Sequence, residues 1–313
     1  MLLFKPFLNE EGKVSQKGFT LIELMIGMAV TTIVGMAGYS FFNNSLNFTV
    51  THSKKAEMQR ETRTAVDMIV REIRSAGFGI LDPLSGGTHT AAAGFSTITP
   101  GNNADPDPEG VANQLDNISI GGGFQMIGTL NVSAPEGANT IVVTPLAGTD
   151  PTNPSIVGRA ITLNGFFTAT VGNVSGPVGG NYTLTLNTSL DRAYSKLNSV
   201  AGLQQITYTV APFGGESALW RNDGAFNQVI ASGIEDLQFG YLLADGTVVN
   251  DPTLNPSPIR GVRISLLARG ADKSPTATIS TRLAIEDHAA GLAPDNFHRR
   301  QITRVVEIRN LGL

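Results

Sequence analysis

The feature that most constrains this chain is an uninterrupted apolar run near its N-terminus. Residues 19–42 contain a single charged side chain, Glu23, and the segment just before them is polar. A helix needs about 20 apolar residues to cross a bilayer, so this run is long enough to do so. A secretory signal has a shorter apolar core that is followed by a small-residue cleavage site, and the run meets neither condition. The run therefore predicts a membrane-spanning helix.

Glu23 is the unusual residue of this run. A carboxylate at the centre of a membrane helix costs about 2.5 kcal/mol or more, and it costs less near a helix end. A plain membrane anchor gives no reason for such a residue. We therefore expect Glu23 to have a function, and we expect its charge to have a partner.

The basic residues on the two sides of the run predict its orientation. Lys5, Lys13 and Lys17 precede it, and the next basic residues, Lys54 and Lys55, follow only a dozen positions after it. Basic residues near a span favour the cytoplasmic side. We expect the N-terminus in the cytoplasm and the bulk of the chain outside.

The helix is predicted to continue beyond the membrane. Apolar or small residues recur at spacings of three and four, which is typical of one buried helical stripe. Gly77 is a typical helix stop. The prediction is one helix over residues 19–77, transmembrane over 19–42 and amphipathic over 43–77. The residues of the stripe are Met58, Thr62, Ala65, Ile69, Ile73 and Ala76.

The remaining chain reads as β structure. Residues 78–115 show little pattern and predict a surface loop region, whereas residues 116–313 alternate short β-type runs with turn residues. The low content of charged residues (15%) and the 35 glycines favour strands and turns. The fold class is α+β, a long helix followed by a mostly antiparallel head domain. A Gly- and Asn-rich region from about 146 to 200 indicates an insertion or subdomain.

The composition argues against an enzyme. The chain has no Cys, and its four His are scattered without metal-ligand spacing, so we interpret them as surface residues. No nucleophile elbow, dinucleotide fingerprint or P-loop is present. The formal net charge of −4 offers no electrostatic footprint for nucleic acid. We expect no catalytic residues and no cofactor, with calcium as the one ion to consider.

A calcium hypothesis comes from one acidic stretch. Asp105, Asp107, Glu109 and Asp116 stand at positions 1, 3, 5 and 12 of a calcium-loop-like spacing, with a glycine where a sharp turn is needed. Against this reading, the last ligand is Asp rather than Glu, neighbouring prolines stiffen the loop, and no helices flank it. The favoured alternative is a solvated acidic loop.

The residues around the start of the apolar run carry a family resemblance. Lys17-Gly18-Phe19-Thr20-Leu21-Ile22-Glu23 resembles the class III signal of type IV prepilins. The resemblance implies that residues 1–18 are a leader, which prepilin peptidase removes between Gly18 and Phe19, and that Phe19 is then N-methylated. It also implies that Glu23 is the membrane-embedded glutamate of this family. Cleavage creates an ammonium at Phe19, and we expect Glu23 to pair with that of a neighbouring subunit.

The C-terminal half narrows the resemblance. Leu219-Trp220-Arg221 and the stretch from Gly233 to Tyr241 are similar to motifs of PilW-type minor pilins and of J-type pseudopilins of type II secretion. The segments 71–77, 261–269 and 304–311 favour the PilW side. Most of these residues are expected to form sheet core rather than a site.

The PilW resemblance implies a minor pilin that takes part in starting type IV pilus assembly at the inner membrane. Its expected partners are other minor and major pilins, which it would contact through the N-terminal helix, together with prepilin peptidase and the inner-membrane assembly platform. It would then lie in the pilus at the cell surface, at the tip of the fibre. The alternatives are a J-type pseudopilin and an adhesive or DNA-uptake tip subunit.

Overall fold

The computed structural model describes residues 19–81, 92–105, 115–152, 155–254, 258–273, 283–290 and 296–310. The chain divides into two compact units, residues 1–53 and 54–313, which are described here separately. Gly18, Asp107 and Glu109 lie outside the described residues.

Helix α1, Leu21–Ser75, is the helix that the apolar run predicts. Its segment Leu21–Leu46 has a mean hydropathy of 1.8 and is long enough to cross a membrane. The large apolar side chains of this segment are exposed, for example Leu21 (77%) and Phe41 (77%). An exposed apolar surface of this extent requires lipid or other apolar helices to cover it.

The second part of α1, from Lys54 on, belongs to the head. The predicted stripe is confirmed, because all six of its residues are buried there. The helix ends at Ser75, and Gly77 follows with a φ of +80°, a conformation that favours glycine. Asn310 caps this end: its side-chain N–H group donates to the carbonyls of Ser75 and Ala76, each at 3.3 Å.

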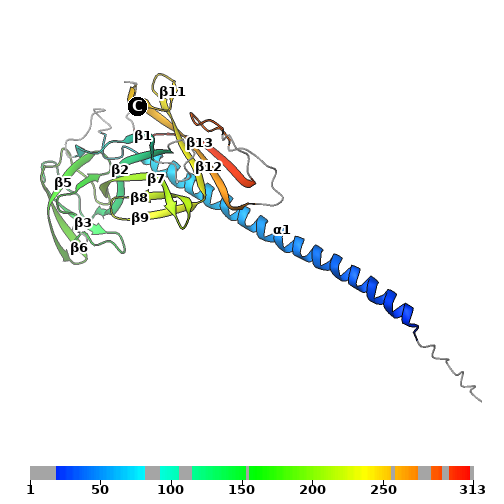
Figure 1. Ribbon diagram of the computed structural model, residues 1–313. Helices are drawn as coiled ribbons and strands as arrows, with labels where there is room; N and C mark the ends of the chain where they lie inside the picture. The colour runs from blue at the N-terminus through cyan, green and yellow to red at the C-terminus, as the bar shows by residue number, and fades with distance from the viewer. Residues whose placement is uncertain are drawn as a thin grey trace, which may run out of the picture. The chain divides into compact units, whose positions relative to one another are not determined.

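The larger of two sheets has nine strands (Figure 1). Its strand order is β1-β2-β3-β6-β5-β4-β7-β8-β9, and all neighbouring pairs are antiparallel. The strands are β1 Ile98–Asp105, β2 Leu115–Leu130, β3 Thr140–Pro145, β4 Ala160–Leu163, β5 Phe167–Val178, β6 Asn181–Leu186, β7 Ser199–Phe213, β8 Glu216–Asn222 and β9 Asn227–Ser232.

An additional pairing between β2 and β7 closes part of this sheet into a barrel. The ring runs β2-β3-β6-β5-β4-β7 and returns to β2, so residues 131–198 form an insertion between two strands that are themselves paired. The predicted insertion at about 146–200 is therefore confirmed, with an earlier start. The barrel has its own core, which includes Leu130, Val143, Ile161, Val171, Leu184 and Val200.

The smaller sheet has the order β11-β10-β12-β13 (Figure 1). One hydrophobic core contains residues of this sheet, of the β2-β7-β8 part of the larger sheet and of α1. The predicted core residues Phe239, Tyr241, Val262 and Ile264 are all buried in it. The elements are β10 Ile234–Leu243, β11 Val248–Val249, the short 3-10 helix η2 Pro252–Leu254, β12 Ile259–Lys273 and β13 Phe297–Glu307.

One part of the loop prediction is wrong. Residues 78–115 were expected to form a surface loop region, but β1 lies within them and pairs with β2, with Ile98 opposite Ile120. The segment contains Pro100, Gly101 and two asparagines, which are poor strand formers. Pairing with the neighbouring strand overrides this local preference.

Gly233, between β9 and β10, gives a first prediction. Its φ is +66°, and a Cβ atom there would lie 2.4 Å from the carbonyl oxygen of Arg269. Gly233→Ala should lower the free energy of unfolding by about 2–4 kcal/mol, since it adds a backbone clash to the cost of a left-handed residue. Urea unfolding of the full chain in detergent, followed by the emission of its one tryptophan, measures the effect.

Gly224 supplies the matched control for this variant. It has a φ of +84°, and a Cβ atom there would meet nothing within 4 Å. Gly224→Ala should therefore show the conformational cost alone, about 1 kcal/mol. Equal losses for the two variants would contradict the clash at Gly233.

Candidate functional site: the first turn of the membrane-length helix

In the first turn of α1, Thr20 donates hydrogen bonds to the carboxylate of Glu23. The Thr20 backbone N–H and the Thr20 hydroxyl both donate to Glu23 Oε2, each at 2.9 Å. In return, the Glu23 backbone N–H donates to Thr20 Oγ1 at 3.3 Å. This reciprocal arrangement is a capping box, which satisfies donors that a helix start otherwise leaves free. The lone carboxylate of the apolar run therefore caps the helix.

One oxygen of this carboxylate accepts both of the bonds that Thr20 donates. Within the described residues, Oε2 holds Thr20, whereas Oε1 accepts no hydrogen bond. Phe19 directly precedes Thr20 and is exposed. An ionised carboxylate with an open oxygen at the start of an exposed apolar helix can receive a cation from outside the chain. Gly18 lies outside the described residues.

The predicted calcium site cannot be assembled from the described residues, because two of its four ligands lie outside them. Asp105 ends β1 opposite Leu115, and Asp107 and Glu109 are outside the described residues. Among the residues with assigned positions, no group of three or more His, Asp or Glu side chains could hold a metal ion. The calcium hypothesis remains a prediction.

Asp116 instead joins the two sheets. Its side chain is buried, its Oδ1 accepts the backbone N–H of Asn103 in β1, and its Oδ2 accepts the backbone N–H of Phe239 in β10, both at 2.8 Å. Burial raises the pKa of Asp116 to about 6, although the two N–H groups act in the opposite direction.

This pKa predicts an unusual pH dependence. The folded state holds the Asp116 proton more tightly than the unfolded chain, so its stabilising contribution is complete below about pH 4 and is lost as the pH rises through about 6. The difference amounts to roughly 3 kcal/mol. We expect Asp116→Asn to abolish this component, measured by urea unfolding at several pH values between about 4 and 7.

Asp150→Asn is the control, because the pKa of Asp150 is shifted in the opposite direction. Hydrogen bonds from the Thr152 hydroxyl and backbone N–H lower the pKa of Asp150, so its contribution is present at neutral pH and fades on acidification. If wild type and Asp116→Asn had the same pH profile, the raised pKa of Asp116 would be refuted.

The sequence did not predict the buried or half-buried charge clusters, which in the described part of the chain include the Arg263–Glu286 pair and three others. Arg299 donates to both oxygens of Glu235 at 2.6 and 2.8 Å. His288, which was expected on the surface, is 5% exposed, and its Nδ1 lies 3.0 Å from Asp236 Oδ2. The prediction for His288 is therefore wrong. The signal that could have found these clusters is the Glu-Asp pair inside an apolar strand, since buried acids require partners.

The third cluster fastens α1 to the larger sheet. Glu72, in the last turns of the helix, accepts hydrogen bonds from Arg221 Nε at 3.0 Å and from the Tyr208 hydroxyl at 2.7 Å. Arg221 also binds Asp223 at 3.0 Å. The Leu-Trp-Arg motif thus contributes the arginine that holds the helix end against β7 and β8.

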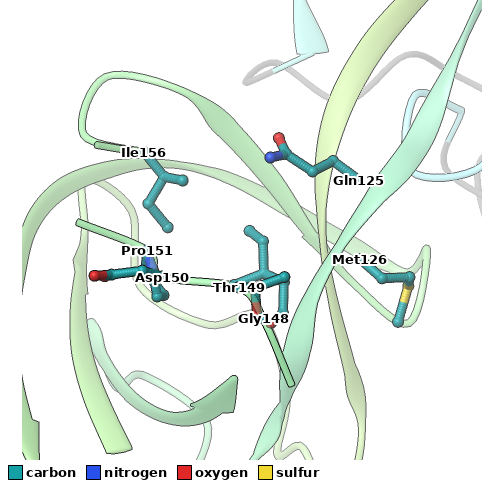
Figure 2. A pocket seen from close by; sticks show the side chains of 8 residues that line it. Gln125, Met126, Gly148, Thr149, Asp150, Pro151 and Ile156 are labelled. Carbon is teal, nitrogen blue, oxygen red and sulfur yellow. Dashed lines mark hydrogen bonds between the residues drawn. The ribbon is translucent and has the colours of Figure 1, made fainter. Parts of the chain in front are cut away.

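The barrel carries a shallow pocket, which Figure 2 shows from close by. Gln125, Met126, Thr149, Asp150 and Ile156 are among the residues that line it. The Met126 and Asp150 side chains point away from each other in this view. The Asp150 carboxylate is also occupied by Thr152. The Asp150 carboxylate is therefore directed to Thr152 rather than to a ligand in the pocket.

Comparison with known proteins gives two family matches. Residues 13–39 match the prokaryotic N-terminal methylation motif, and residues 207–310 match type IV pilus-assembly protein W. No curated protein matches the chain. Among solved structures, a type IV-like pilin from Thermus thermophilus is similar, with 10% identity over 82% of this chain and 97% of that one, at a TM-score of 0.37.

Proposed function

We propose, from the premise that this chain is a type IV pilin-like protein of the PilW type, that it is a minor pilin that helps to start pilus assembly. Prepilin peptidase would remove residues 1–18, and the new N-terminal residue, Phe19, would be N-methylated. The methylation-motif match covers this junction and the start of α1. A structural subunit of this kind performs no catalysis.

The single observation that carries the proposal is the state of Glu23. Its Oε2 completes the capping box, and its Oε1 is left for a cation. Cleavage after Gly18 would create that cation, the ammonium of Phe19. In a filament, the ammonium of one subunit would lie beside Glu23 of its neighbour. Each charge is costly in an apolar environment, and a pair in register neutralises both. The exposed apolar surface of Leu21–Leu46 would be covered by neighbouring stalks.

The size of the head supports a low-copy position at the fibre tip. Residues 131–198 add four strands that close a barrel with β2 and β7, and a head of this size is hard to repeat along a thin fibre. At a tip it has no subunit above it. The basic residues before the span favour a cytoplasmic N-terminus and a periplasmic head, so the expected partners are other pilins and the inner-membrane assembly platform.

The first experiment identifies the N-terminal peptide of the protein in its own membranes by mass spectrometry. A chain that begins at N-methyl-Phe19 is the expected result, and an intact leader in the functional protein would overturn the proposal. A deletion strain then separates the two systems. Loss of pili and twitching supports a pilus subunit, whereas loss of exoprotein secretion with normal pili would assign a pseudopilin.

A further inference from the structure

The face of β2, β7 and β8 that points away from the core carries polar and aromatic side chains. The proposed pilus role does not explain them. Over residues 117–120 of β2 and 206–211 of β7, buried side chains of the core shared with α1 alternate with partly exposed side chains that face away from it. In β8, Leu219 belongs to that core and Trp220 is half-buried. The register places Ser119 opposite Thr207 and Thr207 opposite Asn222, and the next row pairs Thr209 with Trp220. These five side chains are uncharged, and four of them carry a hydroxyl or an amide. The Ser119 and Thr207 hydroxyls bind each other at 2.7 Å, and Asn222 Oδ1 accepts the Gly224 backbone N–H at 2.8 Å, so each group keeps only its remaining donor or acceptor capacity for a ligand.

Trp220 is held in a fixed orientation on this face. Its indole N–H donates to the carbonyl oxygen of Ala211 at 3.3 Å. Ala211 and Ala218 face each other across β7 and β8, directly beside it. Because alanines fill little space, the indole can lie against the sheet there. The hydrogen bond is internal, so the indole is left to act through its ring surface.

Phe213 forms a wall next to this ring. Its centroid lies 5.6 Å from that of Trp220, and the two rings are nearly perpendicular, at 85°. Phe213 is 52% exposed. An edge-to-face pair of this kind is a preferred aromatic arrangement and is worth about 0.5–1.5 kcal/mol beyond burial. The result is a rigid aromatic corner at one end of a row of hydroxyl and amide groups.

We infer that this face binds an uncharged saccharide chain. A pyranose ring has an apolar C–H surface, which stacks on an aromatic ring, and a rim of hydroxyls that donate and accept hydrogen bonds. Thr and Asn side chains also both donate and accept. The nearest acidic group of the face is Glu216, opposite Phe213 at its rim.

Charge complementarity favours this ligand over other classes. A nucleic acid or an anionic lipid surface would require a basic patch, and these rows carry no basic side chain. An apolar partner helix would require a contiguous apolar surface, whereas Thr207, Thr209 and Asn222 interrupt it. The inference goes beyond the proposed pilus role, and its failure would leave that role standing.

The test uses the single tryptophan of the chain as its reporter. The full chain, purified in a detergent without a sugar headgroup, is titrated with cello-, malto- and N-acetylchito-oligosaccharides while Trp220 emission is recorded. Concentrations reach about 10 mM, at which even a millimolar complex is mostly formed. We expect a saturable emission change with at least one of these neutral series, and no change with polygalacturonate.

Single substitutions test whether the saccharide binds at this face. Phe213→Ala keeps the reporter and should weaken binding about tenfold, and Thr209→Val, which removes one hydroxyl at constant shape, should weaken it as well. Phe166→Ala, on the 40% exposed phenylalanine of the barrel, is the matched control and should bind like wild type. The inference is overturned by the absence of a saturable change, by equal binding of Phe213→Ala, or by an emission change that only an added pilin produces.

Discussion

Replacing Glu235 with alanine is expected to lower the free energy of unfolding of the head by about 3–5 kcal/mol. The Glu235 and Arg299 side chains are only 7% and 6% exposed, and both carboxylate oxygens accept N–H groups of the guanidinium. The pair connects β10 to β13 across the intervening β12. Removal of Glu235 takes both of these carboxylate oxygens away from a buried guanidinium, which costs more than the intact pair contributes.

An exposed ion pair provides the comparison. Arg192 and Asp191 form a contact of 2.7 Å, but their side chains are 40% and 38% exposed. Arg192→Ala should cost no more than about 1 kcal/mol. Urea unfolding followed by Trp220 emission measures both variants, and equal losses would contradict our account of Glu235. The double variant Glu235→Leu/Arg299→Leu should recover much of the loss, because it removes both charges.

Glu23→Leu is expected to reduce the number of surface pili about tenfold or more while leaving membrane insertion and leader cleavage intact. This expectation rests on the proposed pairing of Glu23 with the Phe19 ammonium of a neighbour. An uncompensated ammonium in an apolar environment costs several kcal/mol, and 1.4 kcal/mol corresponds to a factor of ten. Electron microscopy counts the pili, and a gel shift of the membrane-bound protein reports leader cleavage.

Thr20→Val separates charge pairing from helix capping. It removes the hydroxyl that exchanges hydrogen bonds with Glu23 but keeps the carboxylate and the Thr20 backbone N–H. The helix start should lose about 1 kcal/mol, and pilus numbers should stay close to wild type. If Thr20→Val were as defective as Glu23→Leu, the capping role alone would explain the requirement for Glu23.

The helix was predictable because its signals are local. The apolar run around Glu23 and the three- and four-residue spacing from Met58 to Ala76 each need only neighbouring residues to be read, and the structure confirms the helix and its buried stripe. β1 was missed because its strand character comes from pairing with β2 rather than from its own residues. The closure of the barrel depends on the β2–β7 pairing, between residues that are far apart in sequence.

The buried ion pairs were hidden for a further reason. The pairing register of β10 and β12 shifts between Ile234 and Asp236, so Glu235 is an extra residue in β10. Such a bulge breaks the strict alternation of a strand. Two consecutive acids can then both be buried, each with its own partner, Arg299 or His288. A two-residue periodicity predicts one of them on the surface, and the partners lie in distant segments.

The position of the barrel has a consequence for how this head can change over time. The inserted segment 131–198 begins after β2 and ends before β7, next to two residues that are paired with each other, Thr129 and Ser199. Joining such ends by a longer or a shorter segment changes the entropy of loop closure only slowly, by about 0.6 kcal/mol for each doubling of length. Residues 131–198 can therefore be exchanged for another module, or for a tight turn, without moving the ends of β2 and β7 apart. A lineage could thus alter what its subunit displays while keeping the same helix and the same means of assembly.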